Sequence, residues 1–261
     1  EDSSYNMPFS IRFRGCLDIE RFRSSFQRIF RLHDIFRSRF YIEDGAARQS
    51  VDEEKELSIT ELMGGEEASL PRLRELMNRP FDLEKDPLLR VALLEISKEE
   101  YLSFIVMNHI AADGSSLRIL SDEFVKLYQG IPVERQELQY KDFALWQRKL
   151  DLSRQEHFWL ERMEGYRREE LPLDFERRGG ERKSEELGFS MDKGSAEKLR
   201  GLCREKDLSL FSVLMAAFQL ALSQFTASDE VIVGTPISGR TAIETQQMVG
   251  MFVNVMPVRG R

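Results

Sequence analysis

Two apolar runs, Leu89–Ile96 and Tyr101–Met107, constrain the fold more than any other feature of this sequence. Only the charged turn SKEE separates them, and neither run alternates cleanly between apolar and polar residues. A strand that is apolar on both faces must be covered on both faces, as in a sheet flanked by helices. The two runs therefore predict an α/β chain of the α+β type, with mixed sheets flanked by helices.

Hydrophobic periodicity predicts the elements around these strands. Residues 7–14 alternate as a strand does, and Asp18 can then cap a helix. The apolar stripe of that helix comprises Ile19, Phe22, Phe26, Ile29 and Phe30. Residues 35–42 have strand character again, whereas residues 43–66 are acidic and turn-rich and should face solvent. Further helices are expected near 69–78, 115–128, 153–165 and 195–206 and from Ser209, and further strands at the runs VIVGT and FVNVMPV.

A polar stretch without apolar period, REELPLDFERRGGERKSEE, divides the chain. It holds a Gly pair and a Pro, which is typical of a linker. We therefore expect an N-terminal lobe over residues 1–165, a linker over 166–185 and a partial C-terminal lobe over 186–261. A lobe that ends on a strand leaves apolar elements uncovered, so we expect it to self-associate or to be poorly ordered.

Composition narrows the class of protein. The apolar fraction of 41% is enough for a core, and the net charge of −7, with both signs mixed along the chain, argues against a nucleic-acid binder. Cys16 and Cys203 lie in unrelated segments and have no metal-ligand spacing. The sequence shows neither a membrane-spanning run nor a signal peptide, so the cytoplasm is the expected compartment and no bound metal is expected.

One of the three histidines stands out. His109 follows the apolar strand FIVMN and precedes a turn and a helix, a position at the end of a sheet where α/β proteins commonly carry function. Asp113 could orient the loop, and Gly114 leaves room for a substrate. A capped helix with His109 merely in the turn is the alternative. His33 at a helix end and His157 on an amphipathic helix are better explained as structural or surface residues.

Five segments carry a resemblance to a known family. MNHIAADGSS around His109 resembles the HHxxxDG core of condensation domains of nonribosomal peptide synthetases. The other four follow in the family's order: RLHDIFRSRF, YKDFALW, IVGTPISGR and VGMFVNVMPVR. Asn108 replaces the first His of the core motif. The family's first motif and its last two are missing, so the resemblance implies a domain truncated at both ends.

The resemblance implies a two-lobed, chloramphenicol-acetyltransferase-like fold whose second lobe is incomplete. It implies a catalytic set of His109, Asp113 and Gly114. The family uses an Arg–Asp bridge to shape the site, and Arg37 is the candidate partner of Asp113, with Asn108 as a second supporting residue. Phe252 and Asn254, on one face of the last strand, are cleft candidates. Tyr140, Phe143 and Trp146 are better explained as packed aromatic surface.

The activity implied is peptide-bond formation between two thioesters, as in antibiotic biosynthesis. Donor and acceptor peptidyl carrier proteins would deliver them on phosphopantetheine arms, beside neighbouring synthetase domains, with no cofactor bound by this chain. No Ser or Cys neighbours His109 as a nucleophile, which favours direct transfer. Two alternatives stay open: a catalytically silent docking domain, and a coenzyme-A-dependent acyltransferase of the same superfamily.

Overall fold

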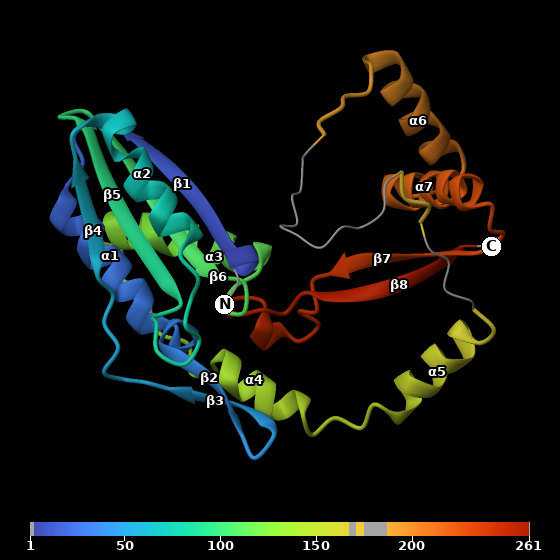
Figure 1. Ribbon diagram of the computed structural model, residues 1–261, viewed down its shortest axis with the longest axis horizontal. Coiled ribbons are helices and arrows are strands. Elements are labelled where there is room, and N and C mark those ends of the chain that lie inside the picture. The colour runs from blue at the N-terminus through green and yellow to red at the C-terminus, as the bar shows by residue number, and fades with distance from the viewer. Residues whose placement is uncertain (1–2, 167–170, 175–186, 261) are drawn as a thin grey trace. The chain divides into compact units, whose positions relative to one another are not determined.

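The computed structural model describes residues 3–166, 171–174 and 187–260, which form two compact units (Figure 1). The first unit holds the described residues up to Leu150 together with Ser238–Asn254. The second unit holds those of Asp151–Ile237 together with the residues from Val255 onward. The predicted lobes place residues 151–165 in the first part and 238–254 in the second, so the two divisions differ there. Most of the predicted linker lies outside the described residues.

A four-stranded mixed sheet forms the centre of the first unit, in the order β1-β6-β5-β4. Its strands are β1 (Asn6–Arg14), β4 (Ile59–Met63), β5 (Leu89–Ser97) and β6 (Glu100–Asn108). β6 pairs antiparallel with both β1 and β5, whereas β4 pairs parallel with β5. The two apolar runs are thus the central strands, and the mixed sheet is as predicted.

Helices cover both faces of this sheet (Figure 1). α1 (Ile19–Leu32) and α3 (Gly114–Tyr128) pack on one face, and α2 (Gly65–Asn78) packs on the other through Leu73. The predicted stripe of α1 is confirmed, since its three phenylalanines and Ile29 are buried. Asp18 caps the helix as predicted, because its carboxylate accepts a hydrogen bond from the Arg21 N–H at 3.0 Å. Both faces of the central strands are therefore sealed from water.

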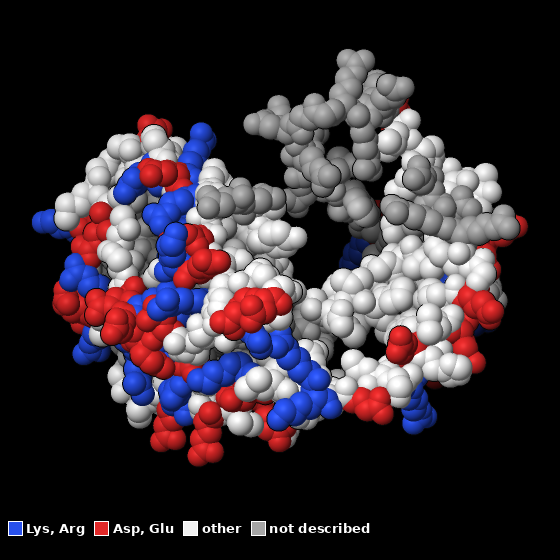
Figure 2. Space-filling view, turned by 60° about the horizontal axis from the view of Figure 1, so that its bottom comes forward, with Lys and Arg blue, Asp and Glu red and all other residues white. Residues whose placement is uncertain are grey.

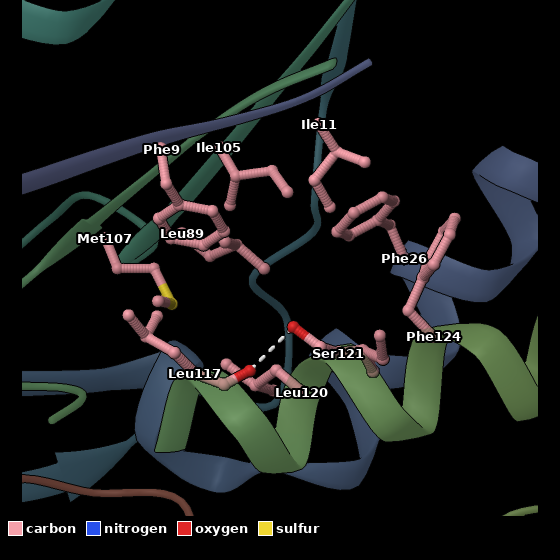
Figure 3. A pocket seen from close by; sticks show the side chains of 11 residues that line it. Phe9, Ile11, Phe26, Leu89, Ile105, Met107, Leu117, Leu120, Ser121 and Phe124 are labelled. Atoms are coloured by element: carbon pink, nitrogen blue, oxygen red, sulfur yellow. Dashed lines mark hydrogen bonds between the residues drawn. The ribbon is translucent and has the colours of Figure 1, made fainter. Parts of the chain in front are cut away.

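A small apolar cavity remains in this core, between the sheet and the two helices. Figure 3 shows apolar side chains of the sheet and of both helices pointing into it. The hydroxyl of Ser121, which also lines it, already donates to the carbonyl of Leu117 at 2.8 Å. The lining residues offer no free polar group, so this cavity is a feature of packing.

The segment after α1 corrects two predictions. Asp34–Arg37 forms the 3-10 turn η2, so the strand predicted from residue 35 begins only at β2 (Ser38–Glu43). Residues 43–66 are not a simple solvent-facing turn, because they contain β3 (Ala46–Val51), which pairs with β2, and β4. Asp44 and Gly45 both have positive φ and form the tight turn that joins β2 to β3. β4 is held in place by its pairing with β5.

The remaining elements of the first unit are short: η1 (Ser3–Tyr5), α4 (Tyr140–Gln147) and η3 (Ile243–Thr245). Over the face of the first unit seen in Figure 2, acidic and basic side chains lie interspersed. Many are paired, as Arg12 is with Glu66 and Glu100. The two charges are interspersed on this surface because acidic and basic residues are interspersed along the sequence.

The second unit has three helices and a two-stranded sheet among its described residues. These are α5 (Ser153–Met163), α6 (Lys193–Glu205), α7 (Leu210–Thr226), β7 (Val231–Ile237) and β8 (Asn254–Gly260). No residue of α7 is buried, and Phe218 and Phe225 are 53% and 63% exposed. No single helix of the described residues is long and apolar enough to span a membrane; α6 and α7 together have the length and composition but are bent by 109°.

Candidate functional site

The His109 loop connects β6 to α3 and is held by its own backbone. The His109 N–H donates to the carbonyl of Tyr5 at 2.8 Å, and the Ala111 N–H donates to that of Asn108 at 2.9 Å. The side-chain oxygen of Asn108 accepts a hydrogen bond from the Ile110 N–H at 3.0 Å. Asn108 is buried and thus closes the turn around His109.

The half-buried imidazole of His109 lines a pocket of about 830 Å³. The two neighbours of His109, together with residues of η1, of the loop before β5 and of the segment after η3, complete the lining: Tyr5, Phe81, Asp82, Leu83, Glu84, Asn108, Ile110 and Met251. The Nδ1 atom of His109 is buried and has no hydrogen-bond partner among the described residues. The imidazole as a residue lines the pocket, and a histidine in that position can exchange a proton with a bound substrate.

Asp113 does not line this pocket but anchors the loop behind it. Its side chain is 1% exposed and caps α3. Its Oδ1 accepts hydrogen bonds from the N–H and the hydroxyl of Ser116, both at 2.8 Å, and its Oδ2 accepts one from the Phe252 N–H at 3.2 Å. The carboxylate is fully engaged with protein donors, which makes it a fixing point for the loop.

The charge of Asp113 is balanced by Arg240, which lies 127 residues further along the chain. Arg240 Nη2 donates to Asp113 Oδ1 at 2.8 Å, and Nη1 donates to the carbonyls of Thr245 and Met248 at 2.5 and 2.6 Å. The guanidinium also lies 4.2 Å above the ring of Phe252. Arg240 therefore ties the segment 238–254 to the N-terminus of α3.

The pKa of Asp113 reflects this environment. Burial raises the pKa, but the hydrogen bonds from Arg240 and Ser116 outweigh burial and hold it below its ordinary value. Asp113 is therefore ionised at neutral pH, as an ion-pair partner must be.

The predicted pairing of Arg37 with Asp113 is wrong. Arg37 is buried in η2, where its guanidinium donates to Asp34 Oδ1 at 2.8 Å and to the carbonyls of Phe30 and Arg31. Asp34 also binds Arg135 and Lys141, both at 2.7 Å. The segments RLHDIFRSRF and YKDFALW thus meet in an ion-pair network of their own, because η2 turns Arg37 back toward the end of α1.

Two further predicted residues lie in different surroundings. Phe252 precedes β8 and is 5% exposed, with its ring 5.2 Å from that of Tyr140 and 4.7 Å from that of Phe143. Asn254 is exposed at the first position of β8, whereas Phe252 lies before that strand. The prediction that the two residues share one strand face is therefore wrong. Phe252 is a packing residue that also bonds Asp113 through its backbone, and neither residue is among those that line the His109 pocket.

The aromatic residues of the segment YKDFALW pack against one another as predicted, and they also pack against the segment VGMFVNVMPVR. The Tyr140 hydroxyl donates to the carbonyl of Met251 at 2.8 Å, and its ring fills the space beside Gly250. Gly114 begins α3, and no atom lies within 4 Å of where a Cβ would stand. That open space agrees with the predicted room beside the loop.

The other two histidines are structural or superficial, as predicted. His33 is buried and its Nε2 lies 2.7 Å from a carboxylate oxygen of Glu123 on α3. The His157 side chain is 76% exposed beside Glu161. Within the described ranges, no group of three or more His, Cys, Asp or Glu is arranged to hold a metal ion.

Arg240 is the site residue that sequence reasoning missed. It ends the motif segment IVGTPISGR, and the resemblance already implied an Arg–Asp bridge, so that segment was the available signal. Arg37 lies nearer in sequence, but only the fold brings Arg240 to Asp113.

Fold and site together define a mixed α/β domain with a histidine loop at the end of its central sheet, and the comparisons place it in a family. The condensation domain family model matches residues 1–261, and this chain belongs to that family. It is 35% identical to surfactin synthase subunit 1 of Bacillus subtilis (strain 168) over 98% of its length, and 36% identical to tyrocidine synthase 3 of Brevibacillus parabrevis over 98%. The chain spans only 7% and 4% of those two proteins.

Solved structures agree in fold. The X-domain in the "Complex of the X-domain and OxyB from Teicoplanin Biosynthesis" matches with a TM-score of 0.83 and 25% identity, over 98% of this chain and 60% of that one. The first condensation domain of the CDA synthetase matches with a TM-score of 0.72 and 17% identity, over 99% of this chain and 65% of that one. The predicted family and fold class are confirmed.

Proposed function

We propose that this chain is the part of a condensation domain that joins a donor acyl or peptidyl thioester to the amine of an acceptor aminoacyl thioester. Both substrates would arrive on the phosphopantetheine arms of carrier proteins within a peptide synthetase. The observation that carries the proposal is the division of roles in the loop: Asp113 is buried and fully bonded to protein, whereas the half-buried imidazole of His109 lines the pocket.

The attack of an amine on a thioester does not require the imidazole to act as a strong base. An α-amine has a pKa of about 8, so a useful fraction is neutral at physiological pH. The amine nitrogen attacks the thioester carbonyl, the C–S bond breaks, and the thiol leaves with the proton that nitrogen loses. His109 would orient the amine and accept that proton in transit, and positioning supplies much of the acceleration. Asp113 and Arg240 would keep the loop in place, and Gly114 and Asn108 would give it space and shape.

The test is His109→Ala in the intact synthetase module, with both carrier proteins loaded. Condensation in a single turnover should fall by about 10²–10⁴-fold, the range of general acid–base catalysis, while the melting temperature stays near that of the parent. His157→Ala is the matched control, because that imidazole is exposed and is not among the residues that line the His109 pocket. Condensation by His109→Ala at the parent rate would refute the catalytic role.

A docking role is the second candidate. The X-domain that shares this fold was solved in complex with another protein, OxyB, and Asn108 stands here in place of the first His of the core motif HHxxxDG. A module that fails to condense any donor and acceptor pair, yet binds another protein of the synthetase, would favour docking. A coenzyme-A thioester accepted in place of the loaded donor carrier would favour the third alternative.

A further inference from the structure

The His109 pocket carries a fixed negative charge. Asp82 and Glu84 line it, and none of its lining residues is a Lys or an Arg. Both acids belong to the run RPFDLEKDP, between α2 and β5. An acidic pocket concentrates cations and disfavours anions.

The side chain of Asp82 is bonded to other residues of its own loop. Its Oδ1 accepts a hydrogen bond from the Glu84 N–H at 3.0 Å, and its Oδ2 lies 3.3 Å from the ammonium of Lys85. Burial opposes ionisation, but these two contacts hold the pKa of Asp82 below its ordinary value. The Asp82 charge is therefore largely balanced by Lys85.

Glu84 differs from Asp82. Its side chain makes no hydrogen bond or ion pair with any part of the chain that the structure describes, and it is exposed where it lines the pocket. A carboxylate without a protein partner is available to pair with a cationic group that enters the pocket.

The backbone that carries Glu84 is well anchored. Phe81 is 6% exposed, and the guanidinium of Arg90 lies 3.7 Å above its ring. Arg90 also donates to the carbonyls of Arg79 and Pro80, and the Phe40 N–H donates to that of Leu83 at 3.0 Å. The loop therefore presents the Glu84 carboxylate from a fixed position.

We propose that Glu84 is a specificity-determining residue, which makes the pocket prefer an acyl group with a basic side chain over one with an acidic side chain. This inference rests on the proposed function, since it names the substrate class of the same site. The carboxylate attracts a side-chain ammonium or guanidinium and repels a side-chain carboxylate. An exposed pair changes binding by up to about five-fold in either direction.

The test is a competition in the intact module, with lysyl and glutamyl thioesters offered together. In one series the acceptor varies and the donor is fixed, and in the other the donor varies. For the substrate that occupies this pocket, Glu84→Gln should lower the ratio of lysyl to glutamyl product by roughly ten-fold, as attraction and repulsion are both lost. Glu84→Lys should invert the preference, and added salt should weaken the parent's preference.

Glu99→Gln is the matched control. Glu99 is an exposed acid in the turn between β5 and β6, at the opposite end of β6 from His109, and should keep the parent ratio. A ratio unchanged by Glu84→Gln and Glu84→Lys in both series would overturn this inference. A parent module that condenses no pair at all would instead overturn the proposed function, so the two failures are distinguishable.

Discussion

Replacing Arg240 with Ala tests whether the Arg240–Asp113 pair holds the histidine loop in place. Both side chains are nearly inaccessible, at 3% and 1% exposure. Breaking a buried pair by removing one partner typically costs about 3–5 kcal/mol, because a charge remains buried without its partner. Asp113 keeps its bonds to Ser116 and Phe252 in the variant, so we expect the lower end, a loss of about 3 kcal/mol in the free energy of unfolding.

The assay can report on the first unit alone. The chain has two tryptophans, and Trp146 lies on α4 in the first unit whereas Trp159 lies on α5 in the second. In a Trp159→Phe background, urea unfolding followed by fluorescence therefore reports on Trp146. Arg118→Ala is the matched control: its side chain is 62% exposed and its pair with Asp122 measures 3.5 Å, so the loss should stay below about 0.5 kcal/mol.

Double variants separate the pair from its surroundings. Arg240→Ala combined with Asp113→Ala should lose less than the sum of the single losses, by roughly 0.5–3 kcal/mol. Arg37→Ala combined with Asp113→Ala should be additive, because Arg37 bonds Asp34 instead. Equal losses for Arg240→Ala and Arg118→Ala, or an additive Arg240–Asp113 pair, would refute the reasoning.

Two further predictions concern acid and packing. The pKa of Asp113 is lowered in the folded state, so the stability that its carboxylate contributes is complete above the unfolded pKa of about 4 and is lost as the pH falls through the folded pKa. Asp113→Asn should therefore flatten the fall of the unfolding free energy between about pH 5 and 2. An unchanged slope would contradict this. Gly250→Ala places a Cβ 2.1 Å from Cδ2 of Tyr140 and should lower the unfolding free energy by about 1–3 kcal/mol in the same urea assay. Gly114→Ala is the control, because the space around that position is open and its stability should stay close to that of the parent. Equal stability of the two variants would show that Tyr140 can move aside.

The spacing of apolar residues along the sequence was enough to predict the helices and strands whose buried residues repeat at a regular interval. The stripe of α1 repeats at helical spacing, and the two central strands are apolar on both faces, so their burial could be read directly. β4 was missed because its five residues lie in an acidic, turn-rich stretch and are fixed by pairing with β5 rather than by their own pattern. Strand pairing over such a distance leaves little local trace.

The candidate site divides in the same way. His109, Asn108 and Asp113 lie within six residues, and their motif predicted a loop that the structure shows to be one hydrogen-bonded unit. Arg37 was predicted as the partner of Asp113 although Arg240 also lies in a motif segment, because no spacing rule connects position 113 with position 240. Periodicity describes single elements, whereas this bridge depends on a chain that returns to the first unit.

That return has a consequence for the order in which the protein is made. A ribosome adds about 5–20 residues per second, so Arg240 is added roughly 6–25 seconds after Asp113, with 127 positions between them. During that interval the sheet and its helices can assemble, but the Asp113 carboxylate lacks its guanidinium and its contact with the Phe252 N–H. The loop that presents His109 is therefore completed after the sheet and helices of the first unit, and a nascent chain that has not reached Phe252 has no finished site to offer an acyl thioester.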